Sequence, residues 1–363
     1  MRKNFIIAGG GTGGHLFPAL AISDELKKRF PNSGIHFVGS KYGLEAQILS
    51  DINYPHTLLS IRGLMRSYSL KGLFRNILFP LRFLIAYLKS RYLIKRLSPA
   101  VVIGTGGYAS GLPLIAAIHK QIPTLIHEQN SYPGLTTRWL SSRVSTVCLS
   151  YEDARQHLKK KSGVVTGNPV RKEILKSEKN TVYNKFGLSK DFIVVGIIGG
   201  SQGALALNKA MEEALEKLDN IQIIWQVGAS HYDNYSNYNN DRIKVLSFVD
   251  DMGAFYKASD LVISRAGALA LAEIAACGKP SLLVPFSKAS GDHQSKNAES
   301  LRAAGAALVI NERNLTGKLL ANEIISLTSD LNRLEKMSHA ARSVSKLDAA
   351  TQIIEEIEEL INI

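Results

Sequence analysis

The sequence predicts an α/β protein with two doubly wound domains, each built on a parallel sheet, and three observations point to that fold class. The chain has 363 residues, which exceeds the size at which one core usually keeps growing. Short β-branched runs alternate with helical patterns, as they do in parallel βαβ units. A glycine-rich turn follows an apolar run in each half, at residues 9–14 and 199–203. We therefore expect two Rossmann-like domains that face one cleft.

The first half of the chain contains runs that we predict to be strands, at residues 5–8, 35–38, 57–60, 101–104, 124–127 and 144–149. The pattern restarts in the second half, at residues 192–198, 221–227, 243–246, 261–264 and 281–285. Turn-forming residues between the two halves, around Gly167 and Pro169, suit a linker. We predict a first domain over residues 1–166 and a second domain over residues 167–340.

The last segment, residues 341–363, is predicted to contain a helix that crosses back to the first domain. Its apolar residues recur at helical spacing, at Ile353, Ile354, Ile357, Leu360 and Ile361. Residues 228–242 are rich in asparagine and tyrosine, and we predict an exposed loop there.

Positive charge is concentrated in one part of the chain. The formal net charge is +13, and no acidic residue lies between Asp51 and Glu128. The basic residues of this window are interleaved with bulky apolar ones rather than with polar ones. That composition favours an anionic membrane surface over nucleic acid as the partner of residues 62–96.

A basic stripe is predicted within this window, because a seven-residue step nearly preserves the face of a helix. The residues with this spacing are Arg75, Arg82, Lys89 and Arg96. We expect the stripe to lie beside apolar residues, namely Leu78, Phe79, Phe83 and Ile85. The alternative is an amphipathic helix packed on its own sheet with a solvated charged edge. The longest apolar stretch, residues 77–88, is shorter than a bilayer span, so we expect peripheral association.

The first glycine turn matches the pattern Gly9-x-Gly11-x-x-Gly14, which is typical of dinucleotide-binding proteins. That interpretation needs an acidic residue at the end of the second strand, where the ribose hydroxyls bind. The second predicted strand is followed by Gly39 and Ser40, so the sequence disfavours a nicotinamide cofactor. A glycine turn before a helix still offers N–H groups to an anion, and we expect both turns to cradle phosphate.

Polar residues follow two predicted strands of the first half. His15 comes directly after the first turn, and an unperturbed imidazole titrates near neutral pH, which suits a general base. The alternative for His15 is a structural or phosphate-binding role. Residues 127–130 are polar and end a predicted strand, where open α/β sheets bind ligands. They suit a hydroxyl-rich ligand, and the alternative for them is a helix cap or a turn.

Two charged residues of the second half are candidates for contacts with a nucleotide. Arg171 follows the predicted linker and suits a phosphate, although an ordinary surface arginine is as common. Glu273 is the single carboxylate on a helix of small residues, which suits a pair of ribose hydroxyls. Cys148 and Cys277 are far apart and show no metal-ligand spacing, and the sequence has no Asp-x-Asp motif, so we expect no metal. We expect no cofactor either.

Several motifs occur in order along the chain, at residues 10–19, 106–111, 127–134, 166–171, 199–204, 265–273 and 293–298. This array resembles the MurG family of bacterial glycosyltransferases, which add N-acetylglucosamine to the lipid-linked muramyl-pentapeptide of peptidoglycan synthesis. The resemblance covers essentially the whole chain. It implies a GT-B fold, with UDP-N-acetylglucosamine held mostly by the second domain. It also implies that the lipid acceptor binds the first domain, at the cytoplasmic face of the inner membrane.

The resemblance implies roles for individual residues as well. The expected contacts with the nucleotide sugar are Thr12, Gly13, Gly14, Asn130, Arg171, Ser201, Val249, Ala268, Leu269, Ala270, Leu271, Ala272, Glu273 and Gln294. Glu273 is expected on the ribose, His15 is the expected catalytic base, and Glu128 is a weaker candidate for the base. The second glycine loop, the dipole of its helix and Arg171 would stabilise the departing diphosphate without a metal, and the anomeric centre would invert.

Other functions share this fold class or this composition. A glycosyltransferase that acts on diacylglycerol would also explain the basic apolar window, but it does not require the motifs at 127–130 and 166–171 in this form. A nucleotide-sugar epimerase would be soluble, and residues 62–96 argue against it. A non-enzymatic module that binds lipid or nucleic acid would leave both glycine turns unexplained.

Overall fold

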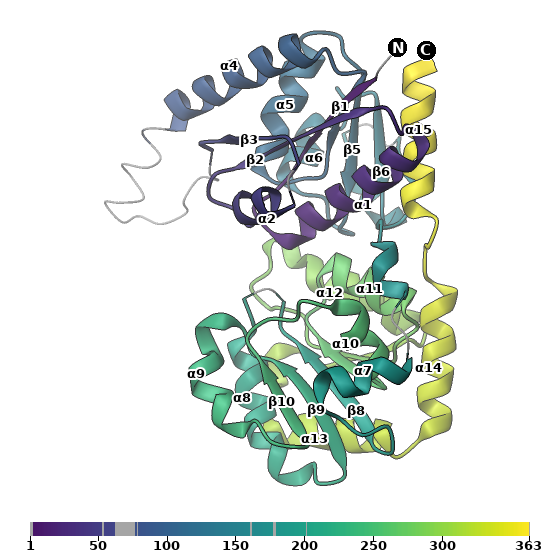
Figure 1. Ribbon diagram of the computed structural model, residues 1–363. Helices are drawn as coiled ribbons and strands as arrows, with labels where there is room; N and C mark the ends of the chain where they lie inside the picture. Colours follow the sequence, from purple (N-terminus) through teal and green to yellow (C-terminus); the bar gives the residue numbers. More distant parts are fainter. Residues whose placement is uncertain are drawn as a thin grey trace. The chain divides into compact units, whose positions relative to one another are not determined.

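Both halves of the chain fold as α/β units in the computed structural model, which describes residues 3–52, 54–61, 77, 79–159, 162–176, 179–200 and 202–362 (Figure 1). Unit 1 comprises Met1–Pro169 together with Asp348–Ile363, and unit 2 comprises Val170–Leu347. The sequence predicted divisions after residues 166 and 340. The second division falls later because helix α14 (Leu331–Ser343) packs in unit 2, against α11 (Ala268–Ala276).

Unit 1 is built on a parallel sheet with the strand order β3-β2-β1-β4-β5-β6-β7. The strands are β1 (Asn4–Ala8), β2 (Gly34–Ser40), β3 (His56–Leu59), β4 (Val101–Gly104), β5 (Thr124–Glu128), β6 (Thr146–Leu149) and β7 (Val164–Val165). Every strand predicted in the first half is confirmed. Strand β7 was not predicted, because 2 residues are too few to show a periodic pattern.

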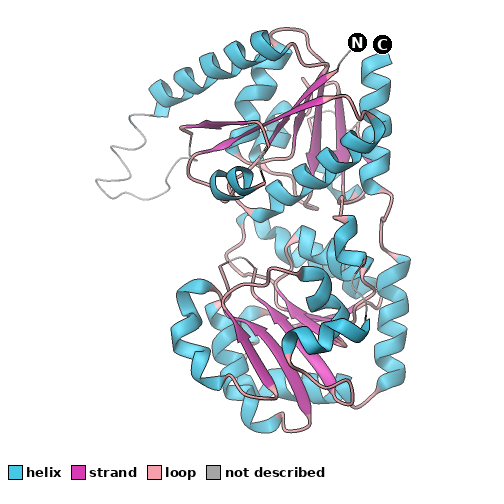
Figure 2. Cartoon of the chain, in the orientation of Figure 1, coloured by secondary structure: helices cyan, strands magenta, loops and turns pink. Residues whose placement is uncertain are grey.

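Helices cover both faces of the unit 1 sheet (Figure 2). They are α1 (Gly13–Arg29), α2 (Glu45–Asp51), α4 (Phe79–Leu97), α5 (Tyr108–Ile118), α6 (Leu135–Leu140), the 3-10 helix η1 (Glu152–His157) and α15 (Ala349–Asn362). Phe5 and Ile7 of β1 pack in the core beneath α1 and α15, whereas the alternate residue Ile6 packs in the core beneath α4 and α5. The C-terminal helix α15 lies beside α1, where Arg29 donates to both carboxylate oxygens of Glu358.

Unit 2 repeats this architecture with the strand order β10-β9-β8-β11-β12-β13. Its strands are β8 (Ile193–Ile198), β9 (Ile221–Gln226), β10 (Ile243–Leu246), β11 (Leu261–Ser264), β12 (Ser281–Leu283) and β13 (Ala307–Val309). All pairs are parallel, and the order is that of Rossmann-like folds, so the predicted fold class is confirmed. Strand β13 was not predicted, because its 3 residues lie in an alanine-rich stretch without a strand pattern.

The remaining helices surround the second sheet. They are η2 (Lys172–Leu175), α7 (Lys179–Phe186), α8 (Leu205–Ala214), η3 (Leu215–Lys217), η4 (Ala229–His231), α9 (Tyr232–Tyr235), η5 (Ser236–Tyr238), α10 (Met252–Ala258), η6 (Ser290–Asp292), α12 (His293–Ala303), η7 (Glu312–Asn314) and α13 (Gly317–Thr328), together with α11 and α14. The prediction of an exposed loop at 228–242 is confirmed in part, because many of these residues are exposed, but it is wrong about the loop, because short helices form there. Within these helices Tyr235 is buried, with its ring centroid 5.0 Å from that of Trp225.

Candidate functional site

The loops that follow β1, β4 and β5 meet at the switch point of the unit 1 sheet, where β1 and β4 are neighbours. The first glycine turn lies against the loop after β4. A Cβ atom at Gly9 would collide with the side chain of Thr105, and a Cβ atom at Gly107 would collide with the carbonyl group of Gly10. Gly107 also has a φ of +75°, a conformation that favours glycine. The glycines of these motifs therefore allow the two loops to touch.

A buried carboxylate occupies the first glycine turn. Glu45 is 0% exposed, and its Oε2 accepts a hydrogen bond of 2.7 Å from the N–H of Gly11. Its Oε1 accepts another of 2.7 Å from the N–H of Ser40, at the end of β2. Side chains at Gly10 or Gly43 would collide with this carboxylate. The expectation that this turn cradles an external phosphate is therefore wrong for Gly11, because its N–H group already binds an internal anion.

His15 lies in the first turn of α1 and is half-buried. Its Nδ1 is 3.0 Å from Oε1 of Gln129, and its carbonyl group accepts a hydrogen bond of 2.8 Å from the hydroxyl of Thr105. The imidazole edge lies against the loop after β4, since a Cβ atom at Gly106 would be 2.6 Å from Nδ1. The loops after three different strands thus hold the imidazole that the sequence predicted as a base.

The polar run 127–130 was predicted to face a hydroxyl-rich ligand, but His127 does not. This side chain is completely buried, and its Nε2 donates to the carbonyl group of Gly167 at 2.9 Å. Burial lowers the pKa of His127 to about 4, so the ring is neutral near pH 7. Gln129 is also buried, and Asn168 donates to its carbonyl group at 3.1 Å. The motifs at 127–130 and 166–168 therefore bind each other.

Glu128 holds its own loop with both carboxylate oxygens. Oε1 accepts from the N–H of Asn130 at 3.1 Å and from its Nδ2 at 3.3 Å, while Oε2 accepts from the N–H of Gly134 at 3.0 Å. The side chain is 3% exposed. This arrangement fixes the turn between β5 and α6, and it places the predicted sugar contact Asn130 at the start of that turn.

The second glycine loop lies between β8 and α8, and it is as open at Gly200 as the first loop is at Gly11. Gly200 has a φ of +90°, and a Cβ atom there would meet no atom within 4 Å. Gly203 has a φ of +75°, and a Cβ atom there would collide with the carbonyl group of Val227. In the described part of this loop, two N–H groups donate to neutral acceptors within the protein. Gly199 donates to the side-chain oxygen of Gln226, and Gly203 donates to the carbonyl group of Gly200.

Glu273 is buried in the second turn of α11. Tyr256 donates its hydroxyl to Oε2 at 3.1 Å, and Nη2 of Arg171 lies 3.9 Å from Oε1. Burial raises the pKa of Glu273 to about 7, although Arg171 and Tyr256 oppose that shift. Tyr256 has no signal in the sequence, because a tyrosine in an apolar helical stretch is usually a core residue. Arg171, which was predicted as a phosphate partner, is here a neighbour of the predicted ribose ligand.

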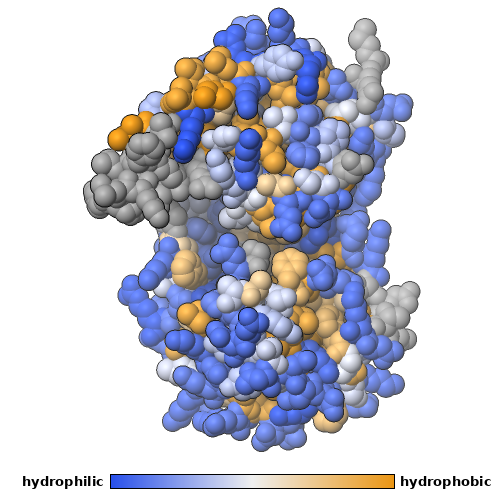
Figure 3. Space-filling view, turned by 60° about the vertical axis from the view of Figure 1, so that its left-hand side comes forward, coloured by the Kyte–Doolittle hydropathy of each residue, from blue (hydrophilic) through white to orange (hydrophobic). Residues whose placement is uncertain are grey.

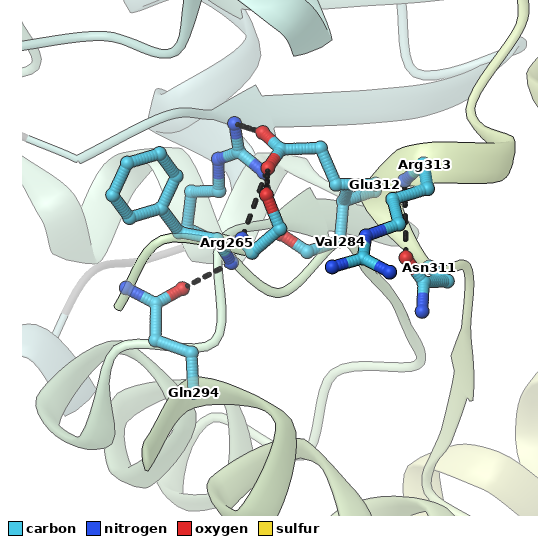
Figure 4. Close-up of polar contacts among 8 residues, drawn as sticks. Arg265, Val284, Gln294, Asn311, Glu312 and Arg313 are labelled. Carbon is cyan, nitrogen blue, oxygen red and sulfur yellow. Dashed lines mark hydrogen bonds and ion pairs between the residues drawn. The ribbon is translucent and has the colours of Figure 1, made fainter. Parts of the chain in front are cut away.

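An ion pair of low exposure holds the loop after β12 (Figure 4). Arg265 donates to Oε1 of Glu312, and Oε2 of Glu312 accepts from the N–H of Ser287 at 2.9 Å. The guanidinium carbon of Arg265 is 5.5 Å from the ring centroid of Phe286. Gln294, at the start of α12, accepts from the N–H of Phe286 at 2.9 Å, so this predicted sugar contact is tied to the same loop. Glu312 gave no signal in the sequence.

The other predicted contacts fall into three groups. Val249 and Leu271 pack their side chains into the hydrophobic core of unit 2. Only the backbone groups of these two residues can therefore reach a ligand. In α11, Ala268 and Leu269 are buried, and Ala270 and Ala272 are half-buried. Residues at the start of α1, exposed or half-buried, are Thr12, Gly13 and Gly14. Ser201 lies outside the described residues.

Helix α4 has two apolar faces. Ala86, Leu93 and Ile94 pack into the core of unit 1. Large apolar side chains are exposed on the opposite face and just before the helix, at Ile77, Leu81, Leu84, Ile85, Leu88 and Tyr92. Figure 3 shows apolar side chains gathered over this part of unit 1, at the upper left of the view. We call these six residues the α4 surface.

The basic stripe is described in part. Arg82, Lys89 and Arg96 lie along α4 at the predicted spacing and border the α4 surface. Arg75, Leu78 and residues 62–74 lie outside the described residues. Of the predicted apolar neighbours, Ile85 is exposed. The prediction is wrong for Phe83, which packs against the core because it shares a helical face with Ala86 and Ser90.

In the described part of the chain, no helix is both long and apolar enough to cross a membrane. The described residues also contain no group of three or more histidine, cysteine, aspartate or glutamate side chains that could hold a metal ion.

Models of one protein family match both halves of this chain. Residues 5–149 match the N-terminal domain of glycosyltransferase family 28, and residues 194–356 match the C-terminal domain of the same family. The two Rossmann-like units and these matches define a glycosyltransferase with the GT-B fold.

Relatives along the full length specify the family further. A protein of Christiangramia forsetii, named UDP-N-acetylglucosamine--N-acetylmuramyl-(pentapeptide) pyrophosphoryl-undecaprenol N-acetylglucosamine transferase, is 39% identical over 98% of this chain and 97% of its own. A protein of Flavobacterium psychrophilum with the same name is 38% identical over 99% and 98%. The crystal structure of Acinetobacter baumannii MurG aligns with a TM-score of 0.77 and 29% identity, over 99% of this chain and 100% of that one. The chain belongs to the MurG family, as the resemblance implied.

Proposed function

We propose that this chain transfers N-acetylglucosamine from UDP-N-acetylglucosamine to the lipid-linked N-acetylmuramyl-pentapeptide diphosphate of peptidoglycan synthesis, converting lipid I to lipid II. The observation that carries the proposal is the match over 98% of the chain to a relative named for this reaction. The epimerase and diacylglycerol alternatives have no comparable support, since relatives at this identity and coverage carry the transferase name.

Unit 2 is the donor-binding unit in this proposal. The carboxylate of Glu273 accepts hydrogen bonds from the two ribose hydroxyls, and the small residues of α11 let the nucleotide approach closely. The open loop at Gly200 and the N-terminus of α8 face the diphosphate, with Arg171 as the nearby cation. These groups stabilise the negative charge that develops on the leaving UDP.

Unit 1 supplies the base. His15 removes the proton from the acceptor hydroxyl while that oxygen forms a bond to the anomeric carbon, and the bond from this carbon to the UDP oxygen breaks. The proton moves to the imidazole, the electron pair leaves with UDP, and a single displacement inverts the anomeric centre. The engagement of both Glu128 oxygens by N–H groups of residues 130 and 134 supports His15 over Glu128 in this role.

A second part of the proposal is peripheral binding of unit 1 to anionic lipid at the cytoplasmic face of the inner membrane. The α4 surface exposes large apolar side chains such as Leu81, at 56%, and Tyr92, at 66%. Arg82 and Lys89 border it, and a basic side chain near an anionic membrane contributes on the order of 1 kcal/mol. Insertion of the apolar face and attraction of the basic border act on the same lipid surface.

Vesicle sedimentation tests this part. The Arg82→Glu/Lys89→Glu double variant is expected to lose binding to vesicles rich in phosphatidylglycerol, most clearly at low salt, where screening is weak. The double variant Lys336→Glu/Lys346→Glu carries the same charge change on exposed residues of unit 2 and should bind like the parent. Equal binding of both double variants would contradict membrane docking through α4.

Transfer itself is tested with UDP-N-acetylglucosamine labelled in the sugar. Reactions contain lipid I, diacylglycerol or no acceptor, and products are separated by chromatography. The proposal predicts a labelled lipid product with lipid I alone. A labelled product with diacylglycerol instead would support the glycolipid alternative. An isomerised nucleotide sugar in the reaction without acceptor would support the epimerase alternative.

A further inference from the structure

A chain of hydrogen bonds links the imidazole of His15 to the backbone of the motif at 166–168. Nδ1 of His15 is 3.0 Å from Oε1 of Gln129, and Nε2 of Gln129 is 3.0 Å from Nδ1 of His127. Nε2 of His127 is 2.9 Å from the carbonyl oxygen of Gly167. The chain runs from the half-buried His15 through two buried side chains, and all of it lies in unit 1.

The buried end of this chain fixes where the protons are. The carbonyl oxygen of Gly167 only accepts, so Nε2 of His127 carries a proton. Because burial keeps His127 neutral, its Nδ1 is then an acceptor, and the amide nitrogen of Gln129 donates to it. That nitrogen also lies 2.9 Å from the carbonyl oxygen of Thr105 and 3.0 Å from that of His127.

These acceptors leave Gln129 a single orientation. A flipped amide would point its oxygen at two carbonyl oxygens and at the lone pair of His127, where no donor is available. The amide oxygen therefore faces His15. An oxygen that only accepts requires a proton on Nδ1 of His15, so the lone pair of the neutral ring is on Nε2.

We propose that Gln129 is a positioning residue that sets the Nδ1–H tautomer of His15, with His127 fixing the orientation of its amide. The tautomer follows from the hydrogen-bond geometry and the burial of His127, whereas its use in catalysis rests on the proposed function. In that use, Nε2 takes the proton of the acceptor hydroxyl, and the Gln129 oxygen keeps its bond to Nδ1–H in the imidazolium that forms. The residue thus holds the ring in place through the whole proton transfer.

The tautomer is measured by NMR on protein with ¹⁵N-labelled histidine, at a pH where the ring is neutral. The His15 signals are assigned by their loss in His15→Ala. We expect a protonated Nδ1 and an unprotonated Nε2 in the parent protein. In Gln129→Met, which keeps the length of the side chain but removes the amide, we expect a shift toward the Nε2–H form.

Kinetics on the same proteins separates positioning from general damage. We expect Gln129→Met to lower kcat about 10- to 100-fold, as loss of a group that orients a ring nitrogen does elsewhere, while the donor KM stays unchanged. Gln47→Met, at an exposed position of α2, is the matched control and should behave like the parent.

A protonated Nε2 in the parent protein would overturn the proposal without any variant. An unchanged tautomer together with an unchanged kcat in Gln129→Met would overturn it as well. If the parent shows the Nδ1–H tautomer but transfers no sugar to lipid I, the proposed function fails and the tautomer assignment is supported.

Discussion

The two glycine loops of this chain follow the central strands of similar sheets but differ in what they hold. In unit 1 the carboxylate of Glu45 is buried in the loop and binds the N–H groups of Gly11 and Ser40. In the described part of the unit 2 loop, Gly199 donates to the neutral amide of Gln226 and Gly203 donates to the carbonyl group of Gly200. One side chain from outside the loop therefore takes up the N–H group of Gly11, which is not available to an external phosphate. This difference supports our proposal that unit 1 supplies the base and that unit 2 binds the anionic donor.

The largest expected effect concerns the base. His15→Ala should lower kcat by about 100- to 10,000-fold, the usual contribution of a general base, with little change in the donor KM. Glu128→Gln should lower kcat less, because that carboxylate holds a turn. Steady-state kinetics with lipid I measures both. A larger loss of kcat in Glu128→Gln than in His15→Ala would move the base to Glu128.

The donor site of unit 2 gives the next largest effect. Glu273→Gln should weaken UDP-N-acetylglucosamine binding by about 10-fold or more, because a hydrogen bond to a charged group contributes roughly 1.5–3 kcal/mol and a neutral amide accepts more weakly. Isothermal titration calorimetry measures the Kd. Glu299→Gln, on an exposed position of α12, is the control and should leave the Kd unchanged. Equal Kd values for Glu273→Gln and the parent would remove Glu273 from the donor site.

The pKa of Glu273 predicts how donor binding depends on pH. Ribose hydroxyls bond best to the ionised carboxylate, and the pKa of about 7 means that this form dominates only above pH 7. Below pH 7 the Glu273 carboxyl group must lose a proton before the donor can bind in this way. The affinity for the donor should therefore rise about 10-fold from pH 6 to pH 8. Titrations with uridine avoid phosphate ionisation and measure the same trend. A pH dependence that persists in Glu273→Gln would assign it to another group.

We expect the smallest change in donor affinity from substitution of Glu45. This substitution tests the difference between the two loops. Glu45→Gln cannot accept both hydrogen bonds, because its NH₂ group faces one of the two N–H donors. Unfolding in urea should show a loss of about 1–3 kcal/mol, the cost of an unsatisfied buried group, while the donor Kd stays the same. A donor Kd that changes with Glu45 would place the nucleotide at the first turn.

Much of the fold followed from local patterns. The strands of both sheets are apolar runs between turn residues, and only the short strands β7 and β13 escaped, because 2 or 3 residues show no period. The region 228–242 was predicted as a loop because it is rich in asparagine, which favours turns. Its packing depends on the ring of Trp225, whose position the local sequence does not reveal.

The site was less predictable than the fold. His15, Glu273 and Gln294 follow strand–turn–helix motifs, and such motifs mark the sheet edge where ligands bind. Glu45 and Tyr256 escaped, because each reaches its partner through tertiary packing and carries no motif of its own. His127 was misread as a residue of the ligand site, since a polar run at a strand end does not reveal which side chains turn inward.

The central claim is that unit 1 supplies the base and unit 2 binds the donor. It is tested by measuring donor binding and turnover together in His15→Ala and Glu273→Gln. Calorimetry gives the Kd for UDP-N-acetylglucosamine, and lipid II formation at saturating donor gives kcat. We expect His15→Ala to bind the donor like the parent but hardly to turn over, whereas Glu273→Gln should bind the donor weakly and keep most of its kcat. Loss of donor binding in His15→Ala with kcat retained at saturation would contradict this claim.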